Sequence, residues 1–202
     1  MGRREEFLEL LGAAEYGERL YQHYELLCKW NEKMNLTTVV SMGEAVRRHY
    51  LESLFLAERV GEGPCRLVDL GSGAGFPGIP VAVSRPDIEV TLVESNQKKA
   101  AFLKEATRGM VNVRVWVGRA EELREEFDWV TLRAVRWEES FGRLGERFVL
   151  LVSDKDAESI RGSGGVVWGE EVRLPESEHG ILLFGKTVPR VYKELCKRSP
   201  RE

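Results

Sequence analysis

From Arg66 onward the sequence alternates short apolar runs rich in β-branched residues with segments of helical character. This alternation predicts a parallel sheet whose strands are joined by crossover helices. The expected strands are Arg66–Leu70, Glu89–Val93, Val113–Val117, Trp129–Arg133, Arg147–Val152, Val166–Leu174 and Gly180–Phe184. The expected helices between them are Ile79–Ser84, Gln97–Thr107, Ala120–Glu126, Trp137–Leu144 and Asp156–Ile160. Only the turn Pro175–His179 separates the last two strands, so they should pair as an antiparallel hairpin at a sheet edge.

The first 62 residues differ from this pattern, because their apolar residues recur at intervals of three and four. This spacing predicts two amphipathic helices between Arg3 and Trp30, broken near Gly12 or Gly17, and a third over Glu44–Val60. We therefore expect a single α/β domain over residues 1–202. It should comprise an N-terminal helical extension (1–62), a Rossmann-like core with a seven-stranded, mostly parallel sheet (63–186), and a basic tail (187–202).

Composition limits the class of protein. Hydrophobic residues make up 43% of the chain, enough for a packed core, and the net charge of −3 argues against a uniformly basic surface, although the 30 Lys and Arg residues can still gather on one face. No apolar stretch approaches the roughly 18 residues that span a bilayer, and the N-terminus lacks the apolar core of a secretory signal. Cys28, Cys65 and Cys196 indicate neither a disulfide framework nor a zinc site. We expect a cytoplasmic protein without membrane span or bound metal.

The segment VDLGSGAGFPGIP, residues 68–80, places four glycines directly after the first expected strand: Gly71, Gly73, Gly75 and Gly78. Glycine lets the backbone approach a ligand closely, since a Cβ atom would occupy the ligand's volume. The helix that follows offers free N–H groups and a partial positive charge at its N-terminus. The segment also matches the dinucleotide fingerprint GxGxxG, so neighbouring residues have to indicate the class of ligand.

Two acidic residues stand at the ends of neighbouring strands. Asp69 lies two residues before the first glycine, where a buried carboxylate needs a donor, either loop amides or a cationic ligand group. Glu94 ends the next strand, where a carboxylate can accept hydrogen bonds from both hydroxyls of a ribose, as in NAD or S-adenosyl-L-methionine. The terminal hairpin and the lack of a second domain to hold a hydride acceptor favour S-adenosyl-L-methionine, whose α-ammonium group suits Asp69.

The third and fourth strands also end in residues that suit a nucleoside site. The third leads into Gly118–Leu123, where a purine could meet backbone amides and pack on Ala120, although the same segment is equally a helix start with an acidic first turn. Arg133 follows the apolar fourth strand. Its guanidinium requires an anionic partner there, supplied either by a ligand or by the protein itself.

Together these residues resemble the RsmG family, also called GidB, of ribosomal RNA small subunit methyltransferases. The matching segments are Lys29–Asn31, Asn35–Thr37, Arg48–His49, Glu52–Ser53, Val68–Pro80, Arg133–Val135 and Pro189–Arg190. The continuation Phe76–Pro80 is specific, because generic methyltransferases rarely follow their glycines in this way. The resemblance implies a class I S-adenosyl-L-methionine-dependent methyltransferase that modifies N7 of a guanosine in 16S rRNA. The partner would be this RNA or the 30S subunit, and the enzyme a monomer.

The resemblance also implies roles for individual residues. Gly71, Phe76, Ala120, Glu121 and Arg133 match the family's cofactor contacts, and they join Asp69, Gly73, Gly75 and Glu94 of the loop and strand ends. Arg133 would lie near the methionine end or the reacting centre and is the residue expected to act in catalysis. The residues expected to contact RNA are Arg48, His49 and Arg190.

The chain departs from the family pattern at two positions. The family usually carries Ser before the Arg–Ala pair and Lys–Gly after the fifth strand, whereas this chain has Leu132 and Val152. These differences bear on the predicted contacts to the target base more than on cofactor binding. Lys155 could reach the same region.

The expected chemistry requires few catalytic side chains. Guanine N7 carries a lone pair and no proton, so its methylation needs orientation and desolvation but no general base. The sequence offers no His–carboxylate or Cys-based constellation, which agrees with this mechanism. Other functions compatible with the sequence are a methyltransferase with a small-molecule or protein substrate, a noncatalytic rRNA-binding factor that keeps the fold, and an NAD-dependent oxidoreductase.

Overall fold

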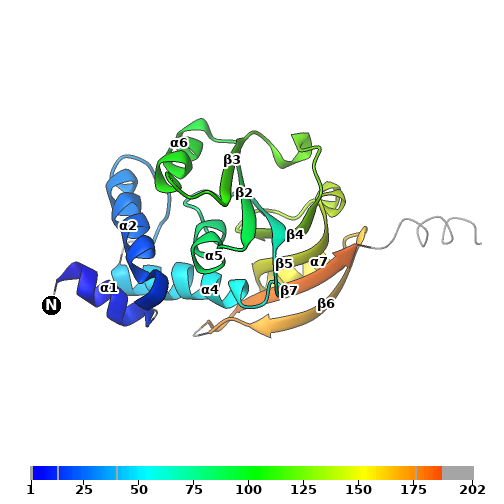
Figure 1. Cartoon of the computed structure of the whole chain (residues 1–202). Coiled ribbons are helices and arrows are strands. Elements are labelled where there is room, and N and C mark those ends of the chain that lie inside the picture. Colours follow the sequence, from blue (N-terminus) through cyan, green and yellow to red (C-terminus); the bar gives the residue numbers. More distant parts are fainter. Residues whose placement is uncertain (1, 13, 40, 176, 188–202) are drawn as a thin grey trace, which may run out of the picture.

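The computed structural model describes residues 2–12, 14–39, 41–175 and 177–187. Within these residues the strands are β1 (Cys65–Leu70), β2 (Ile88–Glu94), β3 (Val113–Val117), β4 (Phe127–Arg133), β5 (Gly145–Ser153), β6 (Val166–Arg173) and β7 (Gly180–Thr187). They form one sheet in the order β3-β2-β1-β4-β5-β7-β6 (Figure 1). The first five strands run parallel, and β7 is antiparallel to both β5 and β6. The predicted parallel core with its terminal antiparallel hairpin is therefore confirmed.

The strand order reverses beside β1, which pairs with β2 on one side and with β4 on the other. Leu70 is level with Val93 of β2 and with Leu132 of β4. The residues that follow these three positions, namely Gly71, Glu94 and Arg133, consequently lie at the same edge of the sheet. Open α/β sheets bind ligands at such a switch point, beyond the carboxyl ends of the strands.

The helices of the described chain are α1 (Arg3–Leu11), α2 (Ala14–Asn31), α3 (Met42–Ala45), α4 (Glu52–Ala57), α5 (Gly78–Ser84), α6 (Gln97–Ala106) and α7 (Asp154–Arg161). A π-helical segment, η1 (Val46–Leu51), joins α3 to α4, and η2 (Ala120–Glu122) and η3 (Glu139–Arg143) are 3-10 turns. The predicted break between the first two helices falls at Gly12, which adopts φ 64° and caps α1 in the left-handed conformation. The predicted third helix is the continuous run α3–η1–α4.

Side chains alternate between the two faces of the sheet, and each face has its own cover. Leu67, Leu92 and Val149 belong to an apolar cluster that includes residues of α1, α2, α4, α5 and α6. Val68 and Leu150 point to the other face and pack with residues of η3 and α7. Figure 1 shows α1 and α2 at one end of the molecule and the β6–β7 hairpin at the other. The N-terminal helices thus share the core of the sheet.

Two of the predicted crossover helices are wrong. The segments 120–126 and 137–144 contain only the short turns η2 and η3. Each return connection has to span a strand of about 20 Å in roughly ten residues, and an α-helix of seven or eight residues advances only about 10–12 Å. A 3-10 turn with extended flanks covers the same distance and still buries Leu123 and Phe141 against the sheet.

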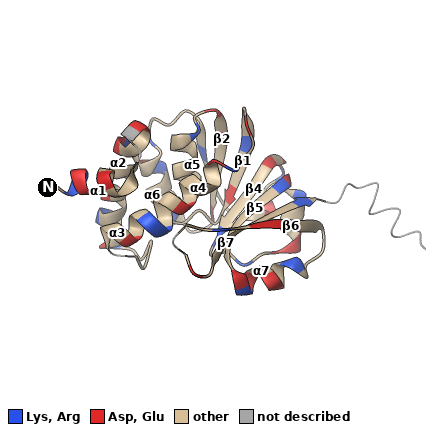
Figure 2. Ribbon diagram, turned by 90° about the horizontal axis from the view of Figure 1, so that it is seen from below, with Lys and Arg blue, Asp and Glu red and all other residues tan. Residues whose placement is uncertain are grey.

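Charge is dispersed over the structure. Figure 2 shows Lys and Arg interspersed with Asp and Glu along the helices and the strands in this view. Glu125, for example, pairs both with Arg66 of β1 and with Arg114 of β3. No helix among the described residues is long and apolar enough to cross a membrane.

His23 of α2 is buried where the N-terminal helices meet the glycine loop. Its Nδ1 lies 2.8 Å from the hydroxyl of Tyr50 and its Nε2 lies 3.0 Å from the carbonyl oxygen of Ala74. The arrangement fits a neutral imidazole that accepts from Tyr50 and donates to Ala74. Burial lowers the pKa of His23 to about 4, so the ring stays neutral in the folded protein.

This lowered pKa predicts an acid-dependent loss of stability. Between pH 6.5 and about 4 the unfolded chain binds a proton at His23 that the folded chain does not, so the free energy of unfolding falls as the pH falls. The advantage of the wild type over His23→Gln, measured by urea unfolding, should shrink by about 2 kcal/mol from pH 7 to pH 5. An advantage that is the same at both pH values would contradict this assignment.

Candidate functional site

Two cavities lie at the carboxyl edge of the sheet and meet at Gly71 and Val135, which line both. We name them the Ala120 cavity, of about 330 Å³, and the Arg133 cavity, of about 340 Å³. Both flank the turn after β1, at the switch point of the strand order. Their shared wall makes one elongated site that extends from η2 to the helix η1.

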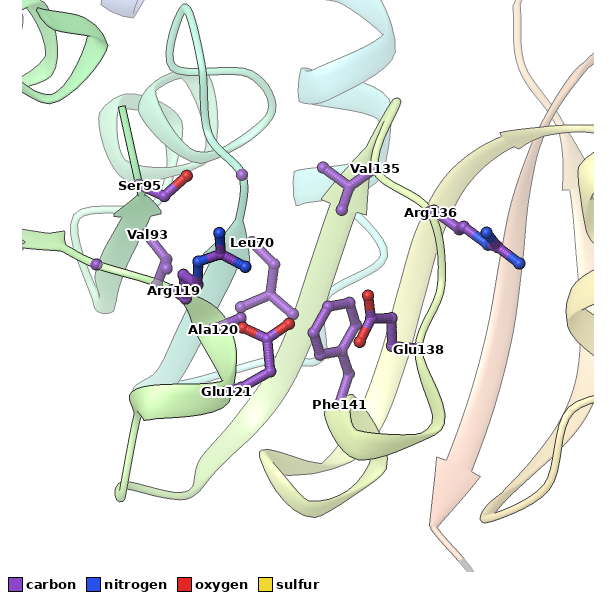
Figure 3. Close-up of a pocket in the computed structure, with 12 residues that line it drawn as sticks. Leu70, Val93, Ser95, Arg119, Ala120, Glu121, Val135, Arg136, Glu138 and Phe141 are labelled. Atoms are coloured by element: carbon purple, nitrogen blue, oxygen red, sulfur yellow. The ribbon is translucent and has the colours of Figure 1, made fainter. Parts of the chain in front are cut away.

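The Ala120 cavity has an apolar floor and a polar rim (Figure 3). Leu70 and Val93 come from the ends of β1 and β2, Ala120 comes from η2, and Phe141 comes from η3. The rim residues are Ser95, Arg119, Glu121, Arg136 and Glu138. Figure 3 shows the carboxylate of Glu121 beside Phe141. A flat aromatic ring with polar edges fits this arrangement, and the structure places both predicted residues of this region, Ala120 and Glu121, on the cavity wall.

The Arg133 cavity is lined by residues from six parts of the chain. The glycine loop contributes Gly71 through Ala74 and Phe76, the ends of β2 and β4 contribute Glu94 and Arg133, and Ala134 and Val135 follow β4. The other lining residues are Leu36, Thr37, His49 and Lys99. His49 of η1 stacks on Phe76, with ring centroids 4.7 Å apart and planes at 24°. Ala134 adopts φ 54°, a left-handed conformation that is costly for a residue with a Cβ.

Asp69 lies beneath the glycine loop and does not line either cavity. Its Oδ2 accepts a hydrogen bond of 3.1 Å from the Gly78 amide, and its Oδ1 is buried without a hydrogen-bond partner. Burial raises the pKa of Asp69 to about 7, against the lowering effect of the Gly78 amide. Of the two roles that the sequence allowed for Asp69, the structure shows the anchoring of loop amides.

Glu94 joins the end of β2 to the glycine loop. Its Oε2 accepts a hydrogen bond of 3.0 Å from the Gly73 amide and its Oε1 accepts one of 2.8 Å from the Asn96 amide. Each carboxylate oxygen can accept a further bond, so the predicted contact to ribose hydroxyls is compatible with this geometry. Glu94 therefore holds the loop and also faces the Arg133 cavity.

Arg133 has the anionic partner that its position at the end of the apolar strand β4 requires. The guanidinium Nη2 lies 2.6 Å from Oε2 of Glu52, the first residue of α4. The other terminal nitrogen, Nη1, is buried without a hydrogen-bond partner. One end of the guanidinium is thus bound by the protein, and the other remains able to donate to an anionic or carbonyl group.

The four glycines of the loop differ in their reasons for being glycine. A Cβ on Gly78 would lie 2.2 Å from Cδ2 of Leu92, and one on Gly75 would lie 2.4 Å from Cδ1 of Ile79, so both are required by internal packing. A Cβ on Gly73 would meet only the Gly71 carbonyl oxygen, at 3.7 Å. Gly71 and Gly73 line the Arg133 cavity, whereas Gly75 does not.

The residues predicted for RNA contact fall in different environments. Arg48 is exposed and pairs with Glu44 at 2.8 Å. His49 is half-buried, with Nε2 3.0 Å from the Thr37 hydroxyl and Nδ1 without a partner. Burial, followed by the charge of Arg133, lowers the pKa of His49 to about 3, so this ring is neutral. Arg190 and the tail beyond Thr187 lie outside the described residues.

Sequence reasoning missed several residues of the site. Lys99, in the first turn of α6, lines the Arg133 cavity, as does Thr37, and Glu52 pairs with Arg133. The sequence did contain a signal for Glu52: it is three residues from His49 on one helix, and residues at this spacing lie on the same face. Lys155 is exposed on α7, and neither Leu132 nor Val152 lines either cavity.

The sheet order, with β7 antiparallel between β5 and β6, defines the fold of the class I methyltransferases. Solved structures agree, and they show similarity of fold alone. An S-adenosylmethionine-dependent methyltransferase from Aquifex aeolicus aligns with a TM-score of 0.59 at 12% identity, over 72% of this chain and 93% of that one. A putative RNA methyltransferase from Pyrococcus horikoshii aligns with a TM-score of 0.53 at 18% identity, over 76% and 89%.

Sequence comparison identifies the family. The model of the GidB family, described as rRNA small subunit methyltransferase G, matches residues 17–153, and the chain belongs to this family. The ribosomal RNA small subunit methyltransferase G of Nitrosomonas europaea is 46% identical over 147 residues, which are 71% of this chain and 66% of that protein. The protein of the same name from Xanthomonas axonopodis is 45% identical over 60% of this chain and 58% of its own length. The chain thus spans slightly less than two thirds of these relatives.

The packing of Gly78 predicts a loss of stability in Gly78→Ala. Alanine normally favours a helix over glycine, but here its Cβ collides with Leu92 and Asp69, so overpacking should lower the free energy of unfolding by about 1–3 kcal/mol. Gly43→Ala is the matched control, because a Cβ on this helical glycine meets only Arg47 at an ordinary 3.5 Å. Urea unfolding should show Gly43→Ala at least as stable as the wild type. Equal stability of the two variants would contradict the packing argument.

The raised pKa of Asp69 predicts the opposite pH trend to that of His23. Between pH 4 and about 7 the folded chain retains a proton on Asp69 that the unfolded chain has lost, so this group lowers stability as the pH rises and adds no further change above about 7. Asp69→Asn removes the titration. Its free energy of unfolding relative to the wild type should rise by roughly 2–3 kcal/mol from pH 5 to pH 7. A pH-independent difference would show that Asp69 is already ionised at pH 5.

Proposed function

We propose that this chain uses S-adenosyl-L-methionine to methylate N7 of a guanosine in 16S rRNA. One observation carries the proposal: in a chain of the rRNA small subunit methyltransferase G family, two cavities meet over the glycine turn at the switch point of the sheet. One cavity has the apolar floor that an adenine needs. The other has the polar groups for the amino-acid end of the cofactor and room for an acceptor.

The residues present fit this cofactor. The Ala120 cavity would hold the adenine between Val93 and Phe141, and Glu94 would accept hydrogen bonds from the ribose hydroxyls. The methionine part would lie along the backbone of Gly71 and Gly73. The free Nη1 of Arg133 is a donor that suits the methionine carboxylate. Asp69 would act indirectly, through the Gly78 amide, on the shape of the loop.

When bound, the cofactor supplies an electrophilic methyl group. The protein has to align the acceptor with it, and the stacked rings of His49 and Phe76 provide a flat wall in the Arg133 cavity against which a purine can lie. His49 is a weak base because burial lowers the pKa of its ring to about 3, and guanine N7 carries no proton to remove. Orientation and exclusion of water are therefore the work of this wall and of Arg133.

The RNA would approach across η1 and the first turn of α6. Arg48 is exposed on η1 and Lys99 lies at the cavity, so both can contact phosphates of an unstacked nucleotide. Arg190 lies outside the described residues, and we include it in the proposed RNA surface only because it matches the family pattern in the sequence. The proposed partner is 16S rRNA or the 30S subunit, and the proposed enzyme is a cytoplasmic monomer.

The proposal is tested by methyl transfer to RNA. The purified chain, given S-adenosyl-L-methionine with a labelled methyl group, should label naked 16S rRNA or 30S subunits, and mass spectrometry of nuclease fragments should identify 7-methylguanosine. Arg133→Met should reduce the rate of methyl transfer about 100-fold or more, because a small displacement of the cofactor or the base from the reactive geometry lowers the rate by about this factor. Arg161→Met is the control, since Arg161 is exposed on α7 and pairs with Glu171.

Two results would contradict the proposed function and indicate a different one. Label in a protein or a small molecule, with none in RNA, would indicate another methyltransferase substrate. Cofactor binding without turnover on either form of the RNA would indicate a noncatalytic rRNA-binding factor.

A further inference from the structure

The charges around the Arg133 cavity are nearly balanced, and Glu52 is required for the balance. Among the described residues that line the cavity, Arg133 and Lys99 are positive and Glu94 is negative, while His49 is neutral. Glu52 does not line the cavity, but its carboxylate is 2.6 Å from the Arg133 guanidinium. It supplies a second negative charge to offset the second positive one.

The Glu52–Arg133 pair is shielded from solvent. The side chains of Arg133 and Glu52 are 19% and 7% exposed, whereas those of the nearby pair Arg48–Glu44 are 61% and 40% exposed. Interactions between shielded charges are stronger and less screened by salt than those between exposed ones. Removing one partner of a shielded pair also leaves the other charge uncompensated. The charge state of Glu52 should therefore be felt inside the cavity.

The proposed reaction makes this charge state important. The bond between the methyl carbon and sulfur breaks with its electron pair remaining on sulfur, and the guanine N7 lone pair forms the new bond. A positive charge thus passes from the sulfonium to the base, and no proton moves. The cavity has to accommodate a cation before and after transfer, so an unpaired guanidinium beside it would be unfavourable.

We infer that Glu52 is a positioning residue that neutralises Arg133 toward the cationic cofactor and holds its guanidinium in place at the wall of the cavity. The inference rests on the proposed function. According to this inference, helix α4 of the N-terminal region helps the site to distinguish the cofactor, which carries a positive sulfonium, from the product, which lacks this charge. A merely structural Glu52 would stabilise the fold without affecting this discrimination.

The discrimination can be measured with two ligands. S-adenosyl-L-methionine and S-adenosyl-L-homocysteine differ by one methyl group and one positive charge, so the ratio of their dissociation constants reports the cavity's preference for the cation. In Glu52→Gln, titration calorimetry should show this ratio shifted about tenfold against S-adenosyl-L-methionine, the effect of one partly buried charge. Glu44→Gln is the matched control, because it breaks an exposed Glu–Arg pair in the same helical run and should leave the ratio unchanged.

Two further variants separate charge balance from folding. Arg133→Met leaves the Glu52 charge uncompensated, so the ratio should move in the opposite direction, in favour of S-adenosyl-L-methionine. The double variant Glu52→Gln/Arg133→Met removes both charges and should return the ratio to within about threefold of the wild type. Because Arg133→Met does not alter Glu52, it tests the inference even if Glu52→Gln fails to fold.

The inference and the proposed function fail in different ways. If the wild type binds neither ligand, the proposed function is wrong. If it binds both, and the ratio does not move in opposite directions in the two single variants or is not restored in the double variant, Glu52 has no role in charge balance.

Discussion

The structure depends on the anchoring of one bare turn, residues 71–75, by buried polar side chains from three different elements. Glu94 of β2 accepts a hydrogen bond from the Gly73 amide, Asp69 of β1 accepts one from the Gly78 amide just beyond, and His23 of α2 contacts the Ala74 carbonyl. Such a turn has little side-chain packing of its own. It keeps one shape because these buried groups would be left unsatisfied if it moved, and an unsatisfied buried polar group is costly.

This anchoring explains why the N-terminal helices belong to the site. His23 and Tyr50 connect α2 and η1 to the loop, His49 stacks on Phe76, and Glu52 holds Arg133. Three nearby positions of one helical run thus contact the loop or Arg133: His49 and Tyr50 pack on Phe76, and Glu52 pairs with Arg133. The π-helical segment η1 contributes to this arrangement, because its wider turn changes which residues share a face. The surface that would meet the RNA and the cavity that would hold the cofactor are consequently built from the same elements.

Much of the architecture was predictable because it follows from local patterns. The strands were found within two or three residues at each end, since apolar β-branched runs bounded by turns mark them clearly. The crossover segments after β3 and β4 were not predicted correctly. Helix propensity favours a helix in both segments, but it carries no information on the distance that the chain has to cover before the next strand. At the site, Gly71, Phe76, Glu94, Ala120 and Arg133 line the cavities, and their contacts to the cofactor stay a prediction. Glu52, Lys99 and Thr37 were missed because each comes from a segment distant in the sequence from the loop it faces.

The sequence by itself determined three features: the order of strands and helices, the bare turn after β1, and the acidic residues at the strand ends. Each of them depends on residues that are close together in the chain. Which partner each buried polar group found was decided only by the tertiary structure. Asp69 could have faced a ligand or the loop amides, and Arg133 could have been free or paired. The energy of a buried charge depends on its burial and on the distance to its partners, and both are set only when segments far apart in the sequence pack together.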